Sequence, residues 1–155
     1  MGRRLLACIV MLLAVGPAAA QTNLGLTEDR VGDLLITRAW AAPSSLSQRT
    51  QSIYMTIANN GTQDDRLVAA HSSVSGDSEL RSHRTGEVVG RARQVDALLL
   101  PAGKTVVLRP GAEYIALIDV EKAQRMGDRV PLLLLFRYAG LLTITVPVMA
   151  GPPDG

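Results

Sequence analysis

The sequence predicts an all-β fold, a sandwich or barrel in a single domain, and two observations carry this prediction. Short apolar runs alternate with turn residues at intervals of about ten residues along most of the chain. Helical periodicity is almost absent, and no later segment is apolar for the roughly 18 residues that a membrane-spanning helix requires. The 155 residues suffice for one such domain.

The first half of the chain supplies its expected strands in order. An apolar run over residues 34–37 leads to Trp40. Residues 53–58 alternate aliphatic with other side chains, as a strand with two unlike faces does, and Asn59-Asn60-Gly61 turns the chain. Residues 66–72 and 78–84 flank Ser75-Gly76-Asp77, a pattern that predicts a β-hairpin.

The second half continues the pattern. Runs over 91–100, 105–108 and 114–120 are separated by two turn segments, each of which contains proline and glycine. For the polar residues 121–128 we expect at most one helical turn. Residues 130–137 and 141–148, joined at Ala139-Gly140, are nearly continuous in apolar side chains, which predicts two central strands of a two-layer core.

The N-terminus predicts a cleavable signal peptide over residues 1–20. Arg3 and Arg4 precede an apolar stretch, and Ala18-Ala19-Ala20 supplies the small side chains that signal peptidase requires, so Gln21 is the expected first mature residue. Leu5-Leu6-Ala7-Cys8 resembles a lipoprotein acylation site, but the apolar run continues past Cys8. We therefore expect a flexible leader over 21–30, one domain over 31–149 and a tail over 150–155, with no membrane span after cleavage.

Composition excludes several classes of function. Removing residues 1–20 takes away two of the 16 basic residues and none of the 14 acidic ones, so the mature chain is formally neutral. A nucleic-acid binder would need a net positive field. Cys8 is the only cysteine and leaves with the signal peptide, so neither a disulfide nor a thiolate metal site is expected.

The order of several short phrases resembles the PCu(A)C family of periplasmic copper chaperones, over about residues 31–148. The phrases are Gly32-Asp33-Leu34, Ala39-Trp40, Tyr54–Gly61, Asp64–Val68, Glu79-Leu80, Leu100–Gly103, Leu108–Gly111 and Thr143–Val148. The resemblance implies a cupredoxin-like Greek-key β-sandwich or barrel in the periplasm. It also implies Cu(I) as cargo, carried towards the copper centre of cytochrome oxidase, with oxidase-assembly proteins as partners.

The family holds Cu(I) with two His-x-Met pairs and a further methionine, because thioether and imidazole suit this soft ion. At these positions this sequence has Arg81 and His83, then a residue near Ala92, then Tyr114 and Ala116. Only His83 is a metal-capable side chain. The resemblance therefore implies a divergent, degenerate metal site, with His83 as its one candidate ligand.

An alternative function is a metal-free binding module. Arg81, Arg84, Arg91 and Arg93 surround His83 against the single acid Glu87. Guanidinium groups favour an anion or an acidic protein surface. The simpler interpretation, which we prefer, is a charged edge that discourages strand aggregation.

The remaining candidates favour structural roles. For His71 and His83 we prefer metal-free surface imidazoles, because one histidine is a weak metal site and a simple hairpin register would place His71 opposite residue 80 or 81. Trp40 and Tyr54 are expected in or near the core, with Tyr114 at its rim. No catalytic residues are predicted: the chain has no G-x-S-x-G elbow, P-loop or dinucleotide fingerprint.

Overall fold

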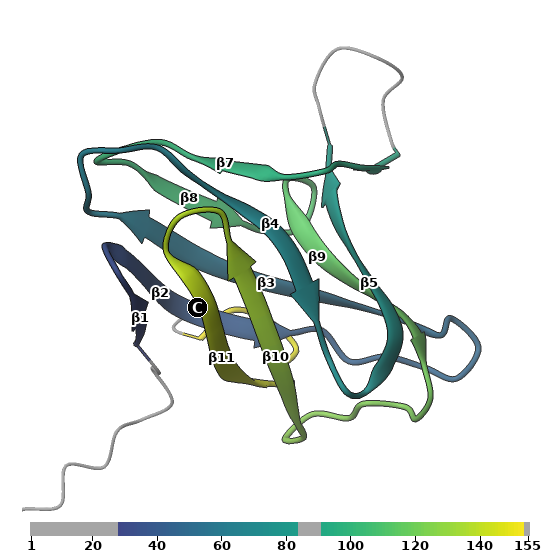
Figure 1. Cartoon of the computed structure of the whole chain (residues 1–155). Coiled ribbons are helices and arrows are strands. Elements are labelled where there is room, and N and C mark those ends of the chain that lie inside the picture. The colour runs from purple at the N-terminus through teal and green to yellow at the C-terminus, as the bar shows by residue number, and fades with distance from the viewer. Residues whose placement is uncertain (1–27, 84–90, 154–155) are drawn as a thin grey trace, which may run out of the picture.

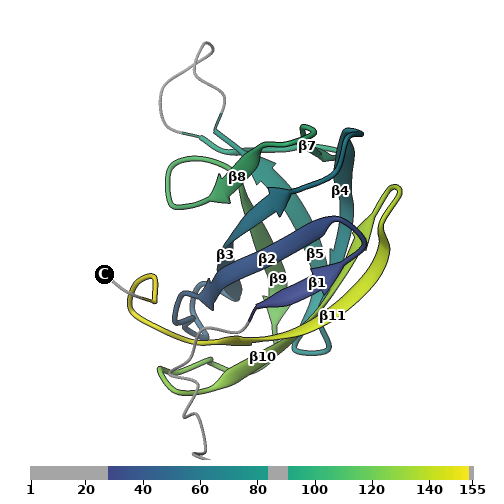
Figure 2. The ribbon, with the colours of Figure 1, turned by 90° about the vertical axis from the view of Figure 1, so that its left-hand side faces the viewer.

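The computed structural model describes residues 28–83 and 91–153, and these form two β-sheets packed face to face (Figures 1 and 2). The predicted all-β fold is confirmed. The described residues contain no helix with the length and apolarity to cross a bilayer. Their strands are β1 (Asp29–Val31), β2 (Leu34–Ala41), β3 (Thr50–Asn59), β4 (Asp65–His71), β5 (Ser75–Ser82), β6 (Arg93–Gln94), β7 (Leu98–Leu100), β8 (Thr105–Leu108), β9 (Tyr114–Val120), β10 (Arg129–Phe136) and β11 (Gly140–Pro147).

The larger sheet has seven strands in the order β1-β2-β3-β9-β5-β6, and β8 also pairs with β3. The N-terminal half of β3 pairs with β9 and its C-terminal half with β8, so one long strand serves two neighbours. The smaller sheet has the order β11-β10-β4-β7. The named strands pair antiparallel throughout, and strands distant in sequence lie side by side, as a Greek-key sandwich requires.

Alternating side chains fill the space between the sheets. On β10, even-numbered residues are buried and odd-numbered ones are exposed or half-buried, because successive side chains of a strand point to opposite faces. Burying each large aliphatic side chain contributes roughly 1.5–3 kcal/mol. The largest core side chains, each under 2% exposed, include Leu34, Ile36, Ile53, Met55, Ile57, Leu67, Leu100, Leu108, Ile115, Leu117, Leu132 and Phe136.

The predicted hairpin around Ser75-Gly76-Asp77 is wrong. β4 pairs with β10 and β7 in one sheet, whereas β5 pairs with β9 and β6 in the other, so the chain crosses between sheets. His71 consequently lies opposite Leu133 of β10, not beside β5. A turn sequence reverses or redirects a chain equally well, and only long-range pairing decides which.

The hairpin of β10 and β11 is confirmed, with Phe136 opposite Gly140 across a short turn. The prediction that both are central strands is wrong for β11, which is an edge strand of its sheet. Outward-facing leucines on this hairpin are exposed, among them Leu135 and Leu141. An unbroken apolar run therefore reflects apolar side chains on both faces here, not burial of both.

Three smaller segments remain, the connection over residues 121–128 and the two ends of the described chain. Residues 121–128 form no helical turn; the Asp128 N–H donates to the Arg125 carbonyl, while Asp128 Oδ2 accepts from the Arg125 N–H. β1 begins at Asp29, within the predicted leader. In the predicted tail, Pro153 is buried and its carbonyl accepts a hydrogen bond from Arg38 Nη2 at 3.2 Å.

Candidate functional site

The positions singled out by the family resemblance converge on the outer face of the seven-stranded sheet. Arg81 of β5 lies directly opposite Tyr114 of β9, and Glu79 lies opposite Ala116. Directly paired residues present their side chains on the same face of a sheet. Arg81, Tyr114 and Ala116 therefore share one face, and His83 follows β5 at the same edge.

His83 is stacked on Tyr114. The two ring centroids are 5.9 Å apart with an interplanar angle of 29°. The His83 backbone N–H also donates to the carbonyl of Ala112, at 3.3 Å, which ties the end of β5 to the turn before β9. The imidazole is half-buried, so one side packs on the phenol while part of the ring remains accessible.

An aromatic row runs across three neighbouring strands of this face. Trp40 of β2 contacts Tyr54 of β3, with ring centroids 4.7 Å apart, and Tyr54 lies 6.1 Å from Tyr114 of β9. Trp40 is 7% exposed and Tyr54 8%, which agrees with the near-core position expected for both. Ring pairs at these distances contribute about 0.5–1.5 kcal/mol each beyond their burial. His83 therefore stacks on Tyr114 at one end of this row, and Trp40 forms the other end.

Arg81 is engaged within the chain. Its Nε and Nη2 donate to Oε2 of Glu79, at 2.8 and 2.7 Å. The hydrogen bond that Arg81 donates to Glu79 raises the pKa of Arg81 above its usual value, and burial lowers it. The negative charge of Glu79 and the Tyr114 hydroxyl also raise this pKa. The guanidinium is therefore positively charged, and the carboxylate of Glu79 neutralises that charge. Glu79 was not predicted as its partner, although residues two apart on a strand share a face.

The other predicted arginines lie around the same edge. Arg91 is exposed, and Arg93 on β6 is exposed opposite Ser82 of β5. Arg84 lies outside the described residues. Near them the Ser82 hydroxyl donates to Oε1 of Glu113, at 3.1 Å, so this edge carries a carboxylate as well as guanidinium groups.

The other methionines and the other histidine of the described residues lie on other segments than His83. Met55 is in the core, Met126 lies in the exposed segment between β9 and β10, and Met149 follows β11. His71 lies on the outer face of the other sheet. Within residues 28–83 and 91–153, no three side chains from His, Cys, Asp and Glu come together as a metal-binding group.

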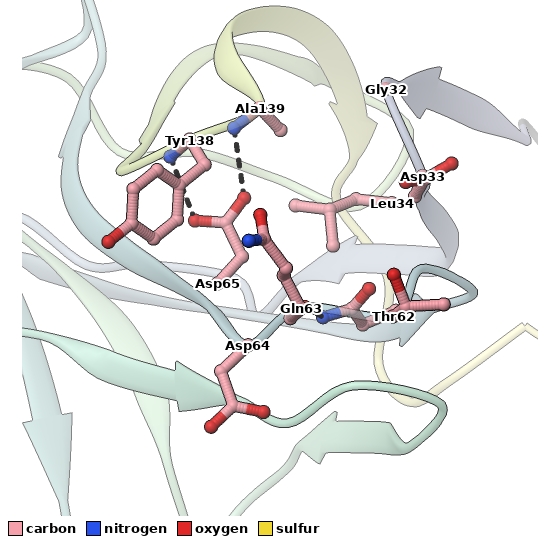
Figure 3. A pocket seen from close by; sticks show the side chains of 10 residues that line it. Gly32, Asp33, Leu34, Thr62, Gln63, Asp64, Asp65, Tyr138 and Ala139 are labelled. Carbon is pink, nitrogen blue, oxygen red and sulfur yellow. Dashed lines mark hydrogen bonds between the residues drawn. The ribbon is translucent and has the colours of Figure 1, made fainter.

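A cavity of about 270 Å³ lies elsewhere, between the turns that join β1 to β2, β3 to β4 and β10 to β11 (Figure 3). Its carboxylates have structural roles. Asp65 accepts hydrogen bonds from the backbone N–H groups of Arg66, Tyr138 and Ala139, and Asp64 accepts one from Ala102. Both carboxylates therefore stabilise the backbone of turns, and the cavity volume is just below the usual range for small-molecule sites.

Comparison with solved structures identifies this architecture as the cupredoxin-like fold of PCuAC domains. The copper-bound PCuAC domain from PmoF2 is 25% identical, with a TM-score of 0.71 over 81% of this chain and 99% of that domain. The apo PCuAC domain from PmoF1 is 28% identical, with a TM-score of 0.71 over 81% of this chain and 100% of that domain. Apo-DR1885 from Deinococcus radiodurans, 20% identical over 97% of both chains with a TM-score of 0.60, shares the fold.

Sequence comparison gives the family. One curated relative, described as "Putative lipoprotein Lxx21020" of Leifsonia xyli subsp. xyli, is 30% identical over 137 residues, which cover 85% of this chain and 76% of the relative. The family model described as "Putative lipoprotein LpqE-like" matches residues 34–148, from the start of β2 to just beyond β11. The chain therefore belongs to the LpqE-like family.

Proposed function

We propose that this protein works outside the cytoplasm as a copper-chaperone-like protein, in which the chain supplies one ligand, His83, and a partner supplies the others. The likeness to PCuAC domains at 25–28% identity, one of them copper-bound, supports the general role. By the family resemblance, the cargo is Cu(I) and its destination is cytochrome oxidase assembly.

The side chains at the family's ligand positions do not fit a Cu(I) site made by this chain alone. Arg81 is a cation without an acceptor atom, Ala116 has no donor atom, and the phenol of Tyr114 lacks the softness that Cu(I) prefers. His83 alone offers an imidazole, and the described methionines lie elsewhere. This chemistry supports the degenerate site that the sequence predicts, which a partner's soft ligands would complete.

One observation carries the proposal: the His83 ring stands at a family ligand position, packed on Tyr114 and partly accessible. Packing restricts the imidazole before a metal arrives, which lowers the entropy lost on binding. A neutral imidazole binds Cu(I) without the tight hold of a thiolate, so transfer to a partner remains feasible.

An anaerobic Cu(I) titration against a competing chelator tests the proposal, with and without a methionine-rich peptide that stands in for the partner. We expect the protein to retain Cu(I) in a ternary complex with the peptide and to compete poorly on its own. His83→Ala should abolish the ternary complex, and the matched control His71→Ala should leave it intact. Failure of the folded wild-type protein to form the complex, or its survival in His83→Ala, would contradict the proposal.

The second candidate is a metal-free module that docks an acidic partner or anion. The exposure of Arg91 and Arg93 favours it, with Arg84 and Arg81 as the other predicted contributors. Because Arg81 is bonded to Glu79, an incoming anion would have to compete with that carboxylate.

Titration with acidic peptides and with phosphate distinguishes this candidate. The double change Arg91→Gln and Arg93→Gln should weaken binding several-fold, since an exposed ion pair is worth about 0.2–1 kcal/mol. Glu79→Gln should strengthen binding, because it releases Arg81 from its internal partner. Arg109→Gln, on the segment between β8 and β9, serves as the control; unchanged affinity in the first two variants would exclude arginine-mediated docking.

A further inference from the structure

The outer face of the four-stranded sheet combines exposed leucines with arginines. One row across it is formed by Ala69 of β4, Leu135 of β10 and Leu141 of β11, which are direct neighbours across the three strands near the β10–β11 turn. Leu99 of β7 lies beside Arg66 of β4. Leu141 is 62% exposed, Leu99 50% and Leu135 38%. In Figures 1 and 2 no described segment covers this face. We call the set Leu99, Leu135, Leu141, Arg66, Arg129 and Arg137 the leucine–arginine face.

The charged side chains assigned to this face are arginines, and the exposed carboxylates of Asp64 and Asp128 lie in the connections beside its two ends. Arg66 and Arg137 lie at one end, joined by a backbone hydrogen bond from the Arg137 N–H to the Arg66 carbonyl, and Arg129 begins β10 at the other end. All three are exposed. The one acid in β4, β7, β10 and β11 is Asp65, which is turned inward and buried by its bonds to backbone N–H groups.

The two ends of the face are separated by the length of β10. Eight residues of an extended strand span about 26 Å. The exposed leucines lie towards the end with Arg66 and Arg137, because Leu135 is the last outward-facing residue of β10 and pairs with Leu141. Arg129 lies at the far end of the same strand, so the apolar patch has two cations beside it and a third at a distance. This is the pattern of a surface that inserts apolar side chains between lipid chains while its cations contact headgroup phosphates.

A second copy of the chain fits this face less well than an anionic surface does. A symmetric dimer through it would place arginines against arginines, because a twofold interface uses the same patch on both subunits. Like charges at close range repel each other. The matched family model and the curated relative are both described as lipoproteins. A lipid attached to a protein holds that protein at a bilayer.

We infer that the leucine–arginine face docks on a bilayer that contains anionic lipids. The contact is peripheral: Leu135, Leu141 and Leu99 enter the interface, and Arg66, Arg129 and Arg137 contact the phosphates. The outer face of the other sheet, which carries His83, then points away from the lipid and remains open to a partner.

Vesicle cosedimentation at low salt tests this docking with the protein purified after export. Every version carries Cys8→Ser, which removes the only thiol to which a lipid could be attached. We expect binding to vesicles that contain phosphatidylglycerol and little binding to pure phosphatidylcholine vesicles. Arg137→Gln should weaken binding about five-fold, since each arginine near an anionic surface contributes about 1 kcal/mol. Leu141→Ser should weaken it about ten-fold, since it removes most of a buried leucine's contribution.

Two matched controls isolate the face. Leu46→Ser changes a leucine that is 65% exposed between β2 and β3, and Arg109→Gln changes an exposed arginine between β8 and β9; both should leave binding unchanged. Far-UV circular dichroism and thermal melts confirm that each variant is folded. Equal binding to both vesicle types, no binding to either, or insensitivity to Leu141→Ser would overturn the inference. So would a dimer in sedimentation equilibrium that Leu141→Ser dissociates, because the face would then be a protein interface.

Discussion

Asp65 joins two turns that are more than 70 residues apart in the sequence. Its Oδ1 accepts from the N–H groups of Arg66 and Tyr138, and its Oδ2 accepts from Ala139 (Figure 3). A buried carboxylate with three donors holds the β10–β11 turn against the start of β4. These bonds are part-buried, so a backbone N–H group that loses the carboxylate is only partly compensated by water.

We expect Asp65→Asn to lower the free energy of unfolding by about 1–3 kcal/mol, because an amide nitrogen in place of one oxygen leaves a backbone donor unpaired. Asp64→Asn is the matched control. Asp64 is exposed and accepts a single bond from Ala102, so this change should stay within about 0.5 kcal/mol. Urea unfolding measures both, and an equal effect of the two substitutions would remove the special role of Asp65.

At the site, the resemblance predicted which residues would meet, but not how they interact. Arg81, His83 and Tyr114 lie together as the family pattern implies, although Tyr114 is more than 30 residues further along the chain. The ion pair of Arg81 with Glu79 could have been found from their spacing along one strand. The aromatic row of Trp40, Tyr54 and Tyr114 could not, because it depends on the order of β2, β3 and β9.

At the level of elements, the hairpin of β10 and β11 depends on one glycine. Gly140 begins β11 with φ of +89°, a conformation that residues with a Cβ rarely adopt. It follows directly on the turn that Asp65 holds. The geometry of this turn sets the register that places Leu135 opposite Leu141.

We expect Gly140→Ala to destabilise the protein by about 1 kcal/mol or more through strain at this φ. Gly151→Ala is the control, since Gly151 has no neighbouring atom within 4 Å of a built Cβ and no positive φ. Thermal unfolding should show a lower Tm for the first variant alone. If Tm is the same for both, the turn tolerates a side chain and does not fix the register.

A strand or turn was predictable where a short local pattern determines it. The sheet to which a strand belongs was not predictable, because it depends on pairing with distant strands. The alternation in β3 and the turn between β10 and β11 are encoded within ten residues. The crossing from β4 to β5 is not, because Ser75-Gly76-Asp77 would also suit a hairpin. The exposure of Leu135 and Leu141 was missed for a related reason. An apolar run in the sequence does not indicate whether another segment covers the outer face of the strand.

At the scale of the whole molecule, the two proposed activities use opposite faces. His83 and the predicted arginines lie on the outer face and edge of the seven-stranded sheet, whereas the leucine–arginine face belongs to the four-stranded sheet. The core between them separates the two surfaces. Lipid contact would therefore leave the candidate copper ligand accessible, and the two proposals can fail independently.

The first 20 residues and Cys8 lead to a prediction for the mature chain. Cleavage after Ala20 should give a protein that begins at Gln21 and carries no lipid, since the apolar run that continues past Cys8 is a signal-peptide pattern. Intact-mass analysis of the exported protein measures this directly. A mass that corresponds to a chain beginning at a lipid-modified Cys8 would contradict it and would match the lipoprotein description of the relatives.

The pairing of β3 with β9 places Thr50 opposite Ile118, so the centre of the larger sheet closes a loop that spans nearly half of the chain. Such closure costs chain entropy before any contact compensates for it. The β10–β11 hairpin has a short turn and can form within microseconds. The larger sheet, next to which His83 lies, forms only after segments distant in the sequence have paired. We therefore expect folding in milliseconds to seconds, with the rate set by assembly of β3, β9 and β5. The surface proposed to receive copper would be among the last parts of the molecule to form.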